Sequence, residues 1–350
     1  MTIIYEYKNS KQKIMKIFNK KIVAITGGTG SFGSMFLEKI SKTSFKEIRV
    51  ISRDEDKQFY LRKKFNNDKI KFLIGDVKDK DQIISYFKNV DIVIHAAALK
   101  QVPSCEYHPD EAIKTNILGS TKVINSAIEN KVKRLVLLST DKAVYPINAM
   151  GMTKALAEKV LISKALYHNN PSTILNIIRY GNVIASRGSV VRTFVDQILN
   201  KKDITVTNNE MTRFLMSLND AMSLLCNALQ FGKQGEIFVQ KAFAAKLRII
   251  AETVLEIFNS RNKIKIIGIR HGEKIHEILV SEEESTKTKN KKNIFIIEPD
   301  SRSLNYNIFF DKGKKKNNKF VFSSQNVKLL TKDQLKKILM KENFIKENLK

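Results

Sequence analysis

Three neighbouring side chains at the end of one apolar run could carry proton chemistry. The run RLVLLST (134–140) ends in Thr140, and Asp141 and Lys142 follow it directly. A carboxyl and an amine can exchange protons with a substrate, but a lysine acts as a base only where burial or nearby cations lower its pKa. The alternative interpretation is a surface ion pair between Asp141 and Lys142 at the end of a strand.

A glycine-rich segment offers a second kind of chemistry, the binding of a pyrophosphate. It follows the apolar run KIVAIT (21–26) and precedes a helical pattern. Glycines in this context let the backbone turn tightly and approach the phosphates, which the N-terminus of the helix then holds. The spacing is GxxGxxG instead of GxGxxG, and the alternative is a tight turn without a ligand. The residues predicted to bind a dinucleotide here are Gly27, Thr29, Gly30, Ser31, Phe32 and Gly33.

The end of the next predicted strand bears on which dinucleotide binds. That strand ends in Ser52, Arg53 and Asp54. An acidic residue at this place binds the ribose 2′-hydroxyl of NAD, whereas an arginine accommodates the 2′-phosphate of NADP. Arg53 favours NADP, Asp54 keeps NAD open, and a plain surface arginine is the remaining alternative. Further cofactor contacts are expected at later strand ends, from Asp76, Val77, Ala96, Ala97 and Ala98.

These residues need strand ends that meet at one edge of a sheet. Continuous apolar runs separated by helical patterns imply a parallel sheet covered on both faces. We therefore predict an α/β fold with a doubly wound parallel sheet of the Rossmann type, which binds ligands at the carboxyl ends of its strands. The predicted strands are 21–26, 47–52, 69–76, 91–98, 134–140 and 173–182, and the predicted helices are 31–42, 79–88, 109–129 and 149–167.

The pattern also suggests a division of the chain. Residues 1–18 are predicted as an N-terminal extension, within which Met15 offers an alternative start. Residues 19–185 form the NADP-binding domain, to which later segments return. Residues 186–350 are mainly a smaller mixed substrate-binding lobe with a C-terminal tail.

Composition excludes several classes of protein. The hydrophobic content of 43% and the 5 prolines among 350 residues argue against wholesale disorder, and no apolar run of membrane-spanning length occurs. The 2 cysteines form neither a disulfide framework nor a zinc cluster, so no metal site is predicted. Without a secretory signal the protein is expected in the cytoplasm, away from membranes.

The net charge of +27 raises the question of a nucleic-acid partner. With 12 arginines the Lys+Arg total of 62 leaves 50 lysines, spread along the whole chain. Arginine is the favoured reader of bases, so this ratio favours solvated surface charge, and no nucleic-acid partner is predicted. The densest basic runs, 287–292 and 312–319, are predicted as exposed loops.

At this point the motifs resemble a known family. TGGTGSFG, STDK and a lysine on the following helix resemble the extended short-chain dehydrogenase/reductase superfamily. The resemblance within it is to the inverting UDP-N-acetylglucosamine 4,6-dehydratases of the capsule and O-antigen type, which start the route to UDP-N-acetyl-L-fucosamine. It covers residues 18–310 and 323–326, through the segments SRDEDKQ, HAAALKQVPSCE, STDKAVYPINAMGMTK, RYGNV, SRGSV, MTRF, RHGEK and SSQN.

The resemblance implies a reaction and roles for the residues. NADP⁺ would take a hydride from the sugar C4, which acidifies C5, and the hydride would return to C6, giving UDP-2-acetamido-2,6-dideoxy-β-L-arabino-4-hexulose. Lys142 is then the base at C5, Asp141 the acid for the departing C6 hydroxyl, and Thr140 the group that orients the C4 hydroxyl. Lys154 would hold the nicotinamide ribose and lower the pKa of a nearby proton acceptor. Lys57 and Lys100 join the cofactor contacts.

One position departs from the superfamily pattern. Most members have a tyrosine four residues before the helical lysine, where this chain has Met150, and a thioether is no useful proton acceptor. Some of the dehydratases that the chain resembles also carry methionine there. The acceptor of the C4 proton stays open between Asp141, a water held by Lys154, and Tyr145.

The resemblance also implies a substrate site and an assembly. Arg213 and Arg270 are expected to bind the diphosphate of UDP-N-acetylglucosamine. Relatives usually have proline where this chain has Arg192, so the loop there is expected to differ. The assembly is a homo-oligomer, by resemblance a hexamer. The other predicted substrate residues are Lys100, Asn182, Arg187, Gly188, Ser189, Val190 and Glu273.

Two other functions stay open. A UDP-sugar 4-epimerase would return the hydride to C4 and needs no acid and base at C5 and C6. A non-catalytic NADP-binding protein is suggested by Met150 alone. A further epimerisation at C3 and the final glycan are not decided by the sequence.

Overall fold

The central element of the protein is a nine-stranded, mostly parallel sheet. The computed structural model describes residues 16–167, 172–186, 188–300 and 319–349. Seven strands run parallel, and β15 joins the edge antiparallel to β10, followed by β14. In spatial order the strands are β14 (Thr288–Asn290), β15 (Ile294–Ile297), β10 (Ile237–Gln240), β6 (Ile174–Tyr180), β5 (Arg134–Thr140), β4 (Ile92–His95), β1 (Ile22–Thr26), β2 (Glu47–Ser52) and β3 (Ile70–Ile74).

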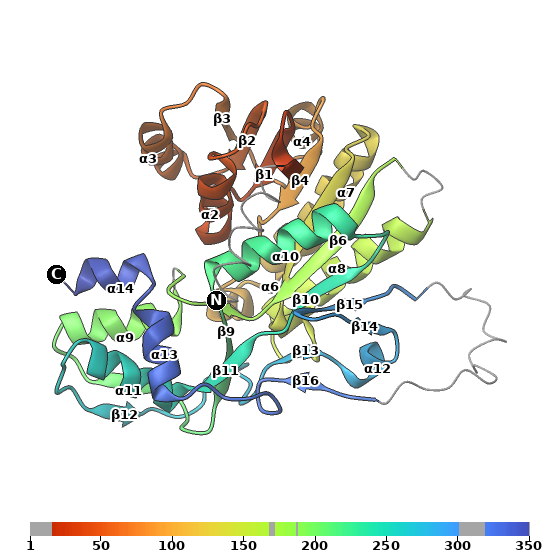
Figure 1. Cartoon of the computed structure of the whole chain (residues 1–350). Coiled ribbons are helices and arrows are strands. Elements are labelled where there is room, and N and C mark those ends of the chain that lie inside the picture. Colours follow the sequence, from red (N-terminus) through yellow and green to blue (C-terminus); the bar gives the residue numbers. More distant parts are fainter. Residues whose placement is uncertain (1–15, 168–171, 187, 301–318, 350) are drawn as a thin grey trace.

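Helices cover both faces of this sheet, which confirms the doubly wound α/β class (Figure 1). One face carries α10 (Leu218–Phe231), which packs on β5, β6 and β10. The other carries α7 (Ser120–Glu129) and α8 (Ala149–Tyr167), which pack on each other. The remaining helices of this part are α2 (Ser31–Ile40), α3 (Glu55–Phe65), α4 (Lys80–Tyr86), α5 (Val102–Tyr107), α6 (Pro109–Ala112), the π-helix η1 (Ile113–Gly119) and the 3-10 helix η2 (Asp141–Ala143).

Most predicted elements are present, and the differences have physical reasons. The predicted helix 109–129 is interrupted by the wide turns of η1. Helix α3 was not predicted because its residues EDKQFYLRKKF show little apolar periodicity; Asp54 caps it by accepting a hydrogen bond from the Lys57 amide. The basic run 287–292 was predicted as a loop, which is wrong for β14, an edge strand where lysines discourage pairing with other chains.

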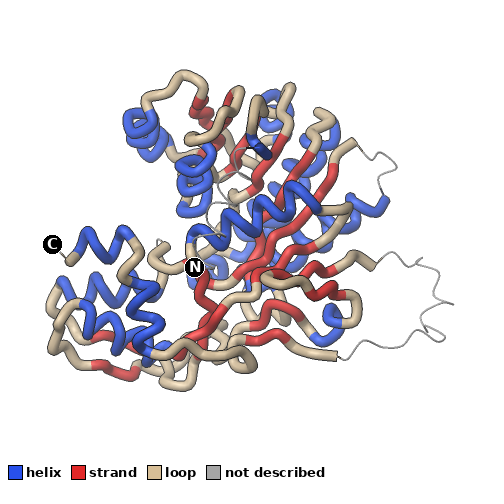
Figure 2. The backbone as a smooth tube through the Cα atoms, viewed as in Figure 1, coloured by secondary structure: helices blue, strands red, loops and turns tan. Residues whose placement is uncertain are grey.

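A second, smaller core lies beside the sheet. Phe194, Val195 and Ile250 belong to it. Phe18, which we had assigned to the N-terminal extension, is instead fully buried in the main core of the sheet. Figure 2 shows the short strands of this lobe between its helices. Its elements are β7 (Asn182–Val183), α9 (Val190–Leu199), β8 (Ile204–Val206), β9 (Thr212–Met216), β11 (Phe243–Lys246), α11 (Leu247–Ile257), β12 (Ile264–Ile266), β13 (Ile278–Val280), α12 (Glu282–Ser285), β16 (Phe322–Ser323), α13 (Lys332–Leu339) and α14 (Asn343–Asn348).

The lobe is inserted into the order of the sheet. It begins after β6, and the chain returns to the sheet with β10 and again with β15 and β14. Within the lobe, β11, β9 and β7 form a three-stranded sheet, β12 pairs with β8, and β13 pairs with β16. The carboxyl ends of the large parallel strands therefore face a boundary that the lobe helps to form. Most of the predicted N-terminal extension, residues 1–15, lies outside the described residues. The same holds for residues 312–318 of the second basic run, which we predicted as an exposed loop.

Candidate active site

The glycine-rich turn after β1 leaves room for a ligand and for nothing larger than glycine at two positions. Gly27 has φ of +65°, and a Cβ there would lie 2.7 Å from the Ala97 backbone. A Cβ on Gly33 would lie 2.4 Å from the Gly27 carbonyl oxygen. The backbone of the turn therefore lies directly against Ala97 at Gly27, and against the turn's own first residues at Gly33. Gly30 precedes α2 and is exposed, so the first amides of α2 can meet an anion.

The tip of β2 is joined to the turn by a short contact. The hydroxyls of Thr29 and Ser52 are 2.6 Å apart. Arg53 has a side chain 56% exposed, and its Nη1 lies 3.6 Å from Asp76 Oδ2 after β3. The Asp54 carboxylate caps α3 and pairs with Lys57. Arg53 and Asp54 had left the choice between NADP and NAD undecided. The structure places them differently, because Asp54 caps a helix and the Arg53 side chain faces solvent.

The ends of β4 and the helix after it complete the cofactor side. Ala96, Ala97 and Ala98 are partly buried beside the turn, Val77 is buried, and Lys100 is exposed. Sequence reasoning missed Asn116 on η1, whose amide bonds both backbone groups of Leu99 and the Thr153 hydroxyl. Asn116 thereby fixes the segment after the alanines to α8.

Lys154 lies on α8 and is buried. Its Nζ donates to the Leu138 carbonyl oxygen at 2.5 Å. Burial lowers the pKa of Lys154 to about 8, with the charge of Glu158 acting in the opposite direction. Burial therefore brings the pKa of the Lys154 amine closer to neutral pH than that of an exposed lysine.

The surroundings of Met150 and Tyr145 bear on which group accepts the C4 proton. Met150 is 5% exposed and packs in a small cluster with Cys105 and Ala112. Tyr145 is on the loop before α8, and its hydroxyl donates to Glu283 Oε2 at 2.5 Å. This bond raises the pKa of Tyr145 above its usual value, so the phenol is not prepared to accept a proton.

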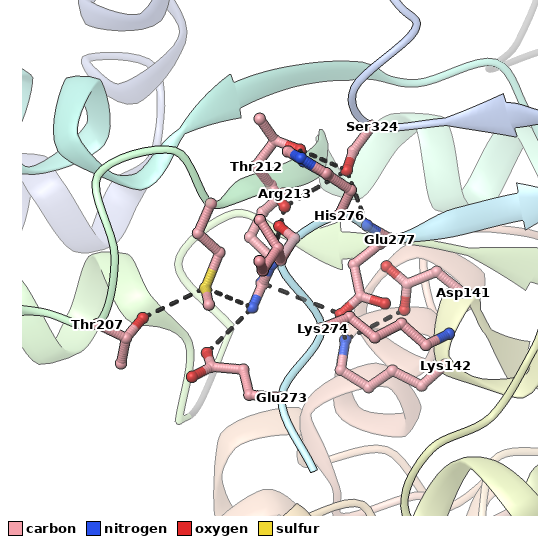
Figure 3. A network of polar contacts seen from close by, with 12 residues as sticks. Asp141, Lys142, Thr207, Thr212, Arg213, Glu273, Lys274, His276, Glu277 and Ser324 are labelled. Carbon is pink, nitrogen blue, oxygen red and sulfur yellow. Dashed lines mark hydrogen bonds and ion pairs between the residues drawn. The ribbon is translucent and has the colours of Figure 1, made fainter. Parts of the chain in front are cut away.

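The predicted acid–amine pair lies at the end of β5, where Asp141 is buried and Lys142 is partly exposed. The Asp141 side chain is 1% exposed, and Lys142 Nζ lies 3.2 Å from its Oδ1. Thr140 donates to the same oxygen at 2.8 Å. The interpretation as a surface ion pair is therefore wrong. A third member comes from the lobe, because Glu277 Oε1 lies 3.0 Å from Lys142 Nζ (Figure 3).

Burial and mutual charge set the protonation of this cluster. Burial raises the pKa of Asp141 above its usual value, and the charge of Glu277 adds to this although Lys142 acts against it. Burial alone would raise the pKa of Glu277, but the charges of Lys142 and Arg213 hold it below its usual value. Burial would lower the pKa of Lys142, yet Asp141 and Glu277 together raise it. The lowered lysine pKa that base catalysis requires is therefore not met at Lys142 in this arrangement.

The predicted phosphate-binding arginines occupy different surroundings. Arg213 is 5% exposed, and its guanidinium donates to the carbonyl oxygens of Thr212 and Ile275 and to Glu273 Oε1 at 3.0 Å. Arg213 and Glu273, both predicted to bind substrate, thus bind each other. Arg270 is exposed in the loop between β12 and β13.

The remaining predicted substrate residues gather where β7 leads into α9. Asn182 is partly buried on β7, and Gly188, Ser189 and Val190 form the entry to α9. The Ser189 hydroxyl is buried without a hydrogen-bond partner among the described residues, and Ser189 is the N-cap of α9 without capping it through its side chain. Arg187 lies outside the described residues. Arg192 stands where relatives usually have proline, and its Nε donates to the Ala185 carbonyl oxygen at 2.6 Å.

A buried ion network supports the site from behind. Arg179 on β6 is 2% exposed and pairs with Glu158 of α8 at 2.6 Å and with Glu284 of α12 at 2.8 Å. Glu158 also accepts from the Ser139 hydroxyl. This network ties the end of β5 and the helix that carries Lys154 to the lobe. Neither Glu158 nor Arg179 was singled out from the sequence.

A sheet of this strand order binds a dinucleotide where the order reverses, between β1 and β4, and the glycine turn lies at that point. The buried lysine on the helix after β5 also matches what the resemblance to the extended short-chain dehydrogenase/reductase superfamily implied. The chain belongs to the polysaccharide biosynthesis protein family, whose model matches residues 23–299, and the model of the C-terminal part of such proteins matches residues 300–346.

Relatives and solved structures agree with this assignment. A protein of Rickettsia bellii (strain OSU 85-389) named UDP-glucose 4-epimerase is 49% identical over 339 residues, which is 95% of this chain and 99% of that protein. The X-ray structure of Pen from Bacillus thuringiensis has a TM-score of 0.85 at 36% identity, over 93% of this chain and 100% of that chain. The fold is shared with DesIV, a dTDP-glucose 4,6-dehydratase from Streptomyces venezuelae, at TM-score 0.65 and 18% identity, over 73% of this chain and 86% of that chain.

Two further properties concern the described residues only. None of their helices is long and apolar enough to cross a membrane. No group of three or more His, Cys, Asp or Glu side chains among them is arranged to hold a metal ion.

Proposed function

We propose that this chain is a cytoplasmic, NADP-dependent 4,6-dehydratase that acts on UDP-N-acetylglucosamine and inverts C5. The observation that carries the proposal is the pair of buried Asp141 and partly exposed Lys142 at the carboxyl end of β5. Removal of water across C5 and C6 needs a base for one hydrogen and an acid for one hydroxyl. An acid and an amine that share one site, with Lys154 on the next helix, supply both kinds of group.

The residues around the glycine turn fit a nicotinamide dinucleotide. The space over Gly27 and Gly33 is closed to any Cβ, and the exposed start of α2 suits a pyrophosphate. The exposed Arg53 supports NADP over NAD, because Asp54 is already engaged as a helix cap. When bound, the cofactor supplies hydride acceptance at the sugar C4 and hydride return at C6.

The protein's own side chains then manage the protons. Asp141, whose pKa is raised by burial, is suited to hold a proton for the departing C6 hydroxyl. Lys142 receives the C5 hydrogen once its ammonium has lost a proton. The Thr140 hydroxyl lies 2.8 Å from Asp141 Oδ1 and is suited to orient the C4 hydroxyl of the sugar. Lys154 would place a positive charge near the group that accepts the C4 proton. Because Tyr145 is bonded to Glu283, the acceptor at C4 is proposed to be a water on Lys154, or Asp141 as a carboxylate that passes the same proton on to the departing C6 hydroxyl.

The entry to α9 supports a nucleotide diphosphate as the anionic end of the substrate. A helix N-terminus favours anions, and the Ser189 hydroxyl there has no partner among the described residues. Arg213 and Arg270 are the cations proposed for the diphosphate. Arg213 can take that role only by releasing Glu273, so we expect the two to separate when substrate binds.

Incubation of the purified protein with UDP-N-acetylglucosamine, followed by NMR of the product in deuterated water, tests the proposal. The expected product has a C4 ketone, a methyl group at C6 and deuterium at C5. A product that retains its C6 hydroxyl and carries no C5 deuterium contradicts it.

A UDP-sugar 4-epimerase is the second candidate, and the name of the Rickettsia bellii relative favours it. Such an enzyme returns the hydride to C4 and leaves C5 and C6 unchanged. The Asp141–Lys142 pair argues against it, because an epimerase needs no acid and base at C5 and C6. The same NMR experiment, repeated with UDP-glucose, decides between the two candidates. A product with inverted C4 and an intact C6 hydroxyl supports the epimerase.

A homo-oligomer, and by resemblance a hexamer, is proposed for the assembly. Leu118 on η1 and Met152 and Leu156 on α8 are 49–53% exposed, and these two helices pack side by side. Such apolar side chains on neighbouring helices suit a contact with a second copy. Light scattering of the eluting protein gives its mass, and a monomer at micromolar concentration contradicts this part of the proposal.

A further inference from the structure

Glu277 is a buried carboxylate in the catalytic cluster that comes from the opposite part of the fold. It directly precedes β13, and its side chain is 1% exposed. The Ser324 hydroxyl accepts from the Glu277 amide at 2.8 Å, and the Ser324 amide donates to the Glu277 carbonyl oxygen at 2.8 Å. The backbone of Glu277 is thus fixed on both sides, and its carboxylate points at Lys142 (Figure 3).

The ion pairs of the Glu277 carboxylate are with Lys142 and Arg213. Its Oε1 lies 3.0 Å from Lys142 Nζ and 4.0 Å from Arg213 Nε. Lys274 lies on the same segment, and its Nζ donates to the Val144 carbonyl oxygen at 2.5 Å. The charged groups that face Glu277 are therefore Lys142 and Asp141 after β5, Arg213 on β9, and Lys274 on its own segment.

Two carboxylate oxygens of this cluster have no hydrogen-bond partner among the described residues. They are Glu277 Oε2 and Asp141 Oδ2, and both are buried. Buried polar atoms in folded proteins are almost always paired, so these two atoms beside one amine have room in their hydrogen bonding for a water or a reacting molecule. The oxygens of Glu277 and Asp141 that do have partners are those that contact Lys142.

The pKa values of the two carboxyl groups beside Lys142 are shifted in opposite directions. Lys142 lies between two carboxyl groups, of which Asp141 holds a proton more readily because burial raises its pKa. Glu277 is the one that stays ionised, because Lys142 and Arg213 outweigh the effect of its burial. The lasting ionic partner of the Lys142 ammonium is therefore Glu277, although Asp141 is its neighbour in the chain.

We propose that Glu277 is a positioning residue for Lys142, which fixes the Nζ atom between the sheet and the lobe and sets the pH at which that atom loses its proton. This inference rests on the proposed function only for the task of Lys142 as a base at C5. With Glu277 ionised, Lys142 stays an ammonium over the neutral range, and the free amine is a minor form. A neutral side chain at position 277 shifts that balance toward the free amine.

Competitive acetylation with acetic anhydride tests the proposal on the full chain without any turnover. Acetylation of each lysine is followed by mass spectrometry over a range of pH, which yields the pKa of Lys142 and of Lys154 separately. Wild type is compared with Glu277→Gln, which removes the charge at similar size, and with Glu277→Asp, which keeps it. Lys154 is the internal control, because Glu277 is not among the groups that shift its pKa.

Glu277→Gln is expected to lower the pKa of Lys142 by about 1–3 units and to leave Lys154 unchanged. Glu277→Asp is expected to stay close to wild type. An unchanged Lys142 pKa in Glu277→Gln overturns the inference. Should that variant fail to fold, the wild type still decides, because a Lys142 pKa at or below the usual lysine value contradicts it.

The pH dependence of turnover links the inference to the reaction. If Lys142 is the base, the acidic limb of kcat moves to lower pH in Glu277→Gln by the same amount as the pKa from acetylation, and KM changes less. A purely structural role for Glu277 lowers kcat at every pH without moving the limb, and this result overturns the inference. A shifted Lys142 pKa in a protein that does not dehydrate UDP-N-acetylglucosamine supports the role of Glu277 and contradicts the proposed function instead.

Discussion

Replacing Arg53 by glutamine is expected to weaken NADP binding and leave NAD binding unchanged. A charge-assisted contact with the 2′-phosphate contributes about 1.5–3 kcal/mol. To make it, Arg53 must leave Asp76, and at 3.6 Å in solvent this ion pair is worth about 1 kcal/mol. The difference of roughly 0.5–2 kcal/mol corresponds to an increase in the NADPH Kd of about 2- to 30-fold.

Fluorescence titration of nucleotide-free protein with NADPH and with NADH measures this effect. The matched control is Arg62→Gln on α3, an exposed arginine that lies over the Phe72 ring and away from the turn. The preference should also shrink at high salt, because the Arg53 side chain is largely exposed. An equal loss of both affinities, or an unchanged ratio between them, refutes the reasoning.

Three other predictions concern catalysis and one concerns stability. Lys142→Ala should retain NADPH binding and lose C5 exchange with deuterated water by about 10²-fold or more; near-normal exchange, read by NMR, reassigns the base. Met150→Tyr should fold and change single-turnover C4 oxidation, read as NADPH absorbance, by less than about tenfold; an NADPH transient and product formed only by this variant would make the natural protein inactive. Because burial lowers the pKa of Lys154 to about 8, its charge is present below that pH and lost above it. C4 oxidation should therefore fall above pH 8, and a rate that keeps rising through this range contradicts the role of the charge. Arg179→Met leaves Glu158 and Glu284 without their partner and should lower the unfolding free energy by about 3–5 kcal/mol. The exposed Arg248→Met should lower it by less than about 1 kcal/mol in the same urea titration, and equal losses would contradict the reasoning.

The fold was predictable where hydrophobic pattern and sheet burial agree. Strands β2 and β5 and helix α8 have the bounds read from the sequence, because each is a continuous apolar run or a long helical pattern. Helix α3 and strand β14 were missed because polar residues dominate both, and what places them is a cap in one case and pairing with β15 in the other. Local pattern carries no information on such partners.

The candidate site divides in the same way. Residues close in the chain, such as Asp141 and Lys142, could be singled out because their strand end is visible in the sequence. Glu277 could not, since the pairing of β13 with β16 and the contact with Ser324 bring it to Lys142. For the same reason the sequence could not show that Arg213 binds Glu273, or that Lys142 has a raised pKa and not a lowered one.

The insertion of the lobe between β6 and β10 has a consequence for synthesis of the protein in the cell. Strand β6 ends at Tyr180, but its neighbour β10 begins only at Ile237 and the sheet edge closes with β15 at Ile297. At about 5–20 residues per second, the ribosome needs roughly 3–12 seconds to make the chain between Tyr180 and Gln240, and roughly 6–23 seconds to reach Ile297. Until β10 has been made, the apolar residues Ile177 and Ile178 lack the strand that pairs with them in the folded sheet. The nascent chain therefore presents an open, hydrophobic strand edge for several seconds, and such an edge can pair with other chains until β10 covers it.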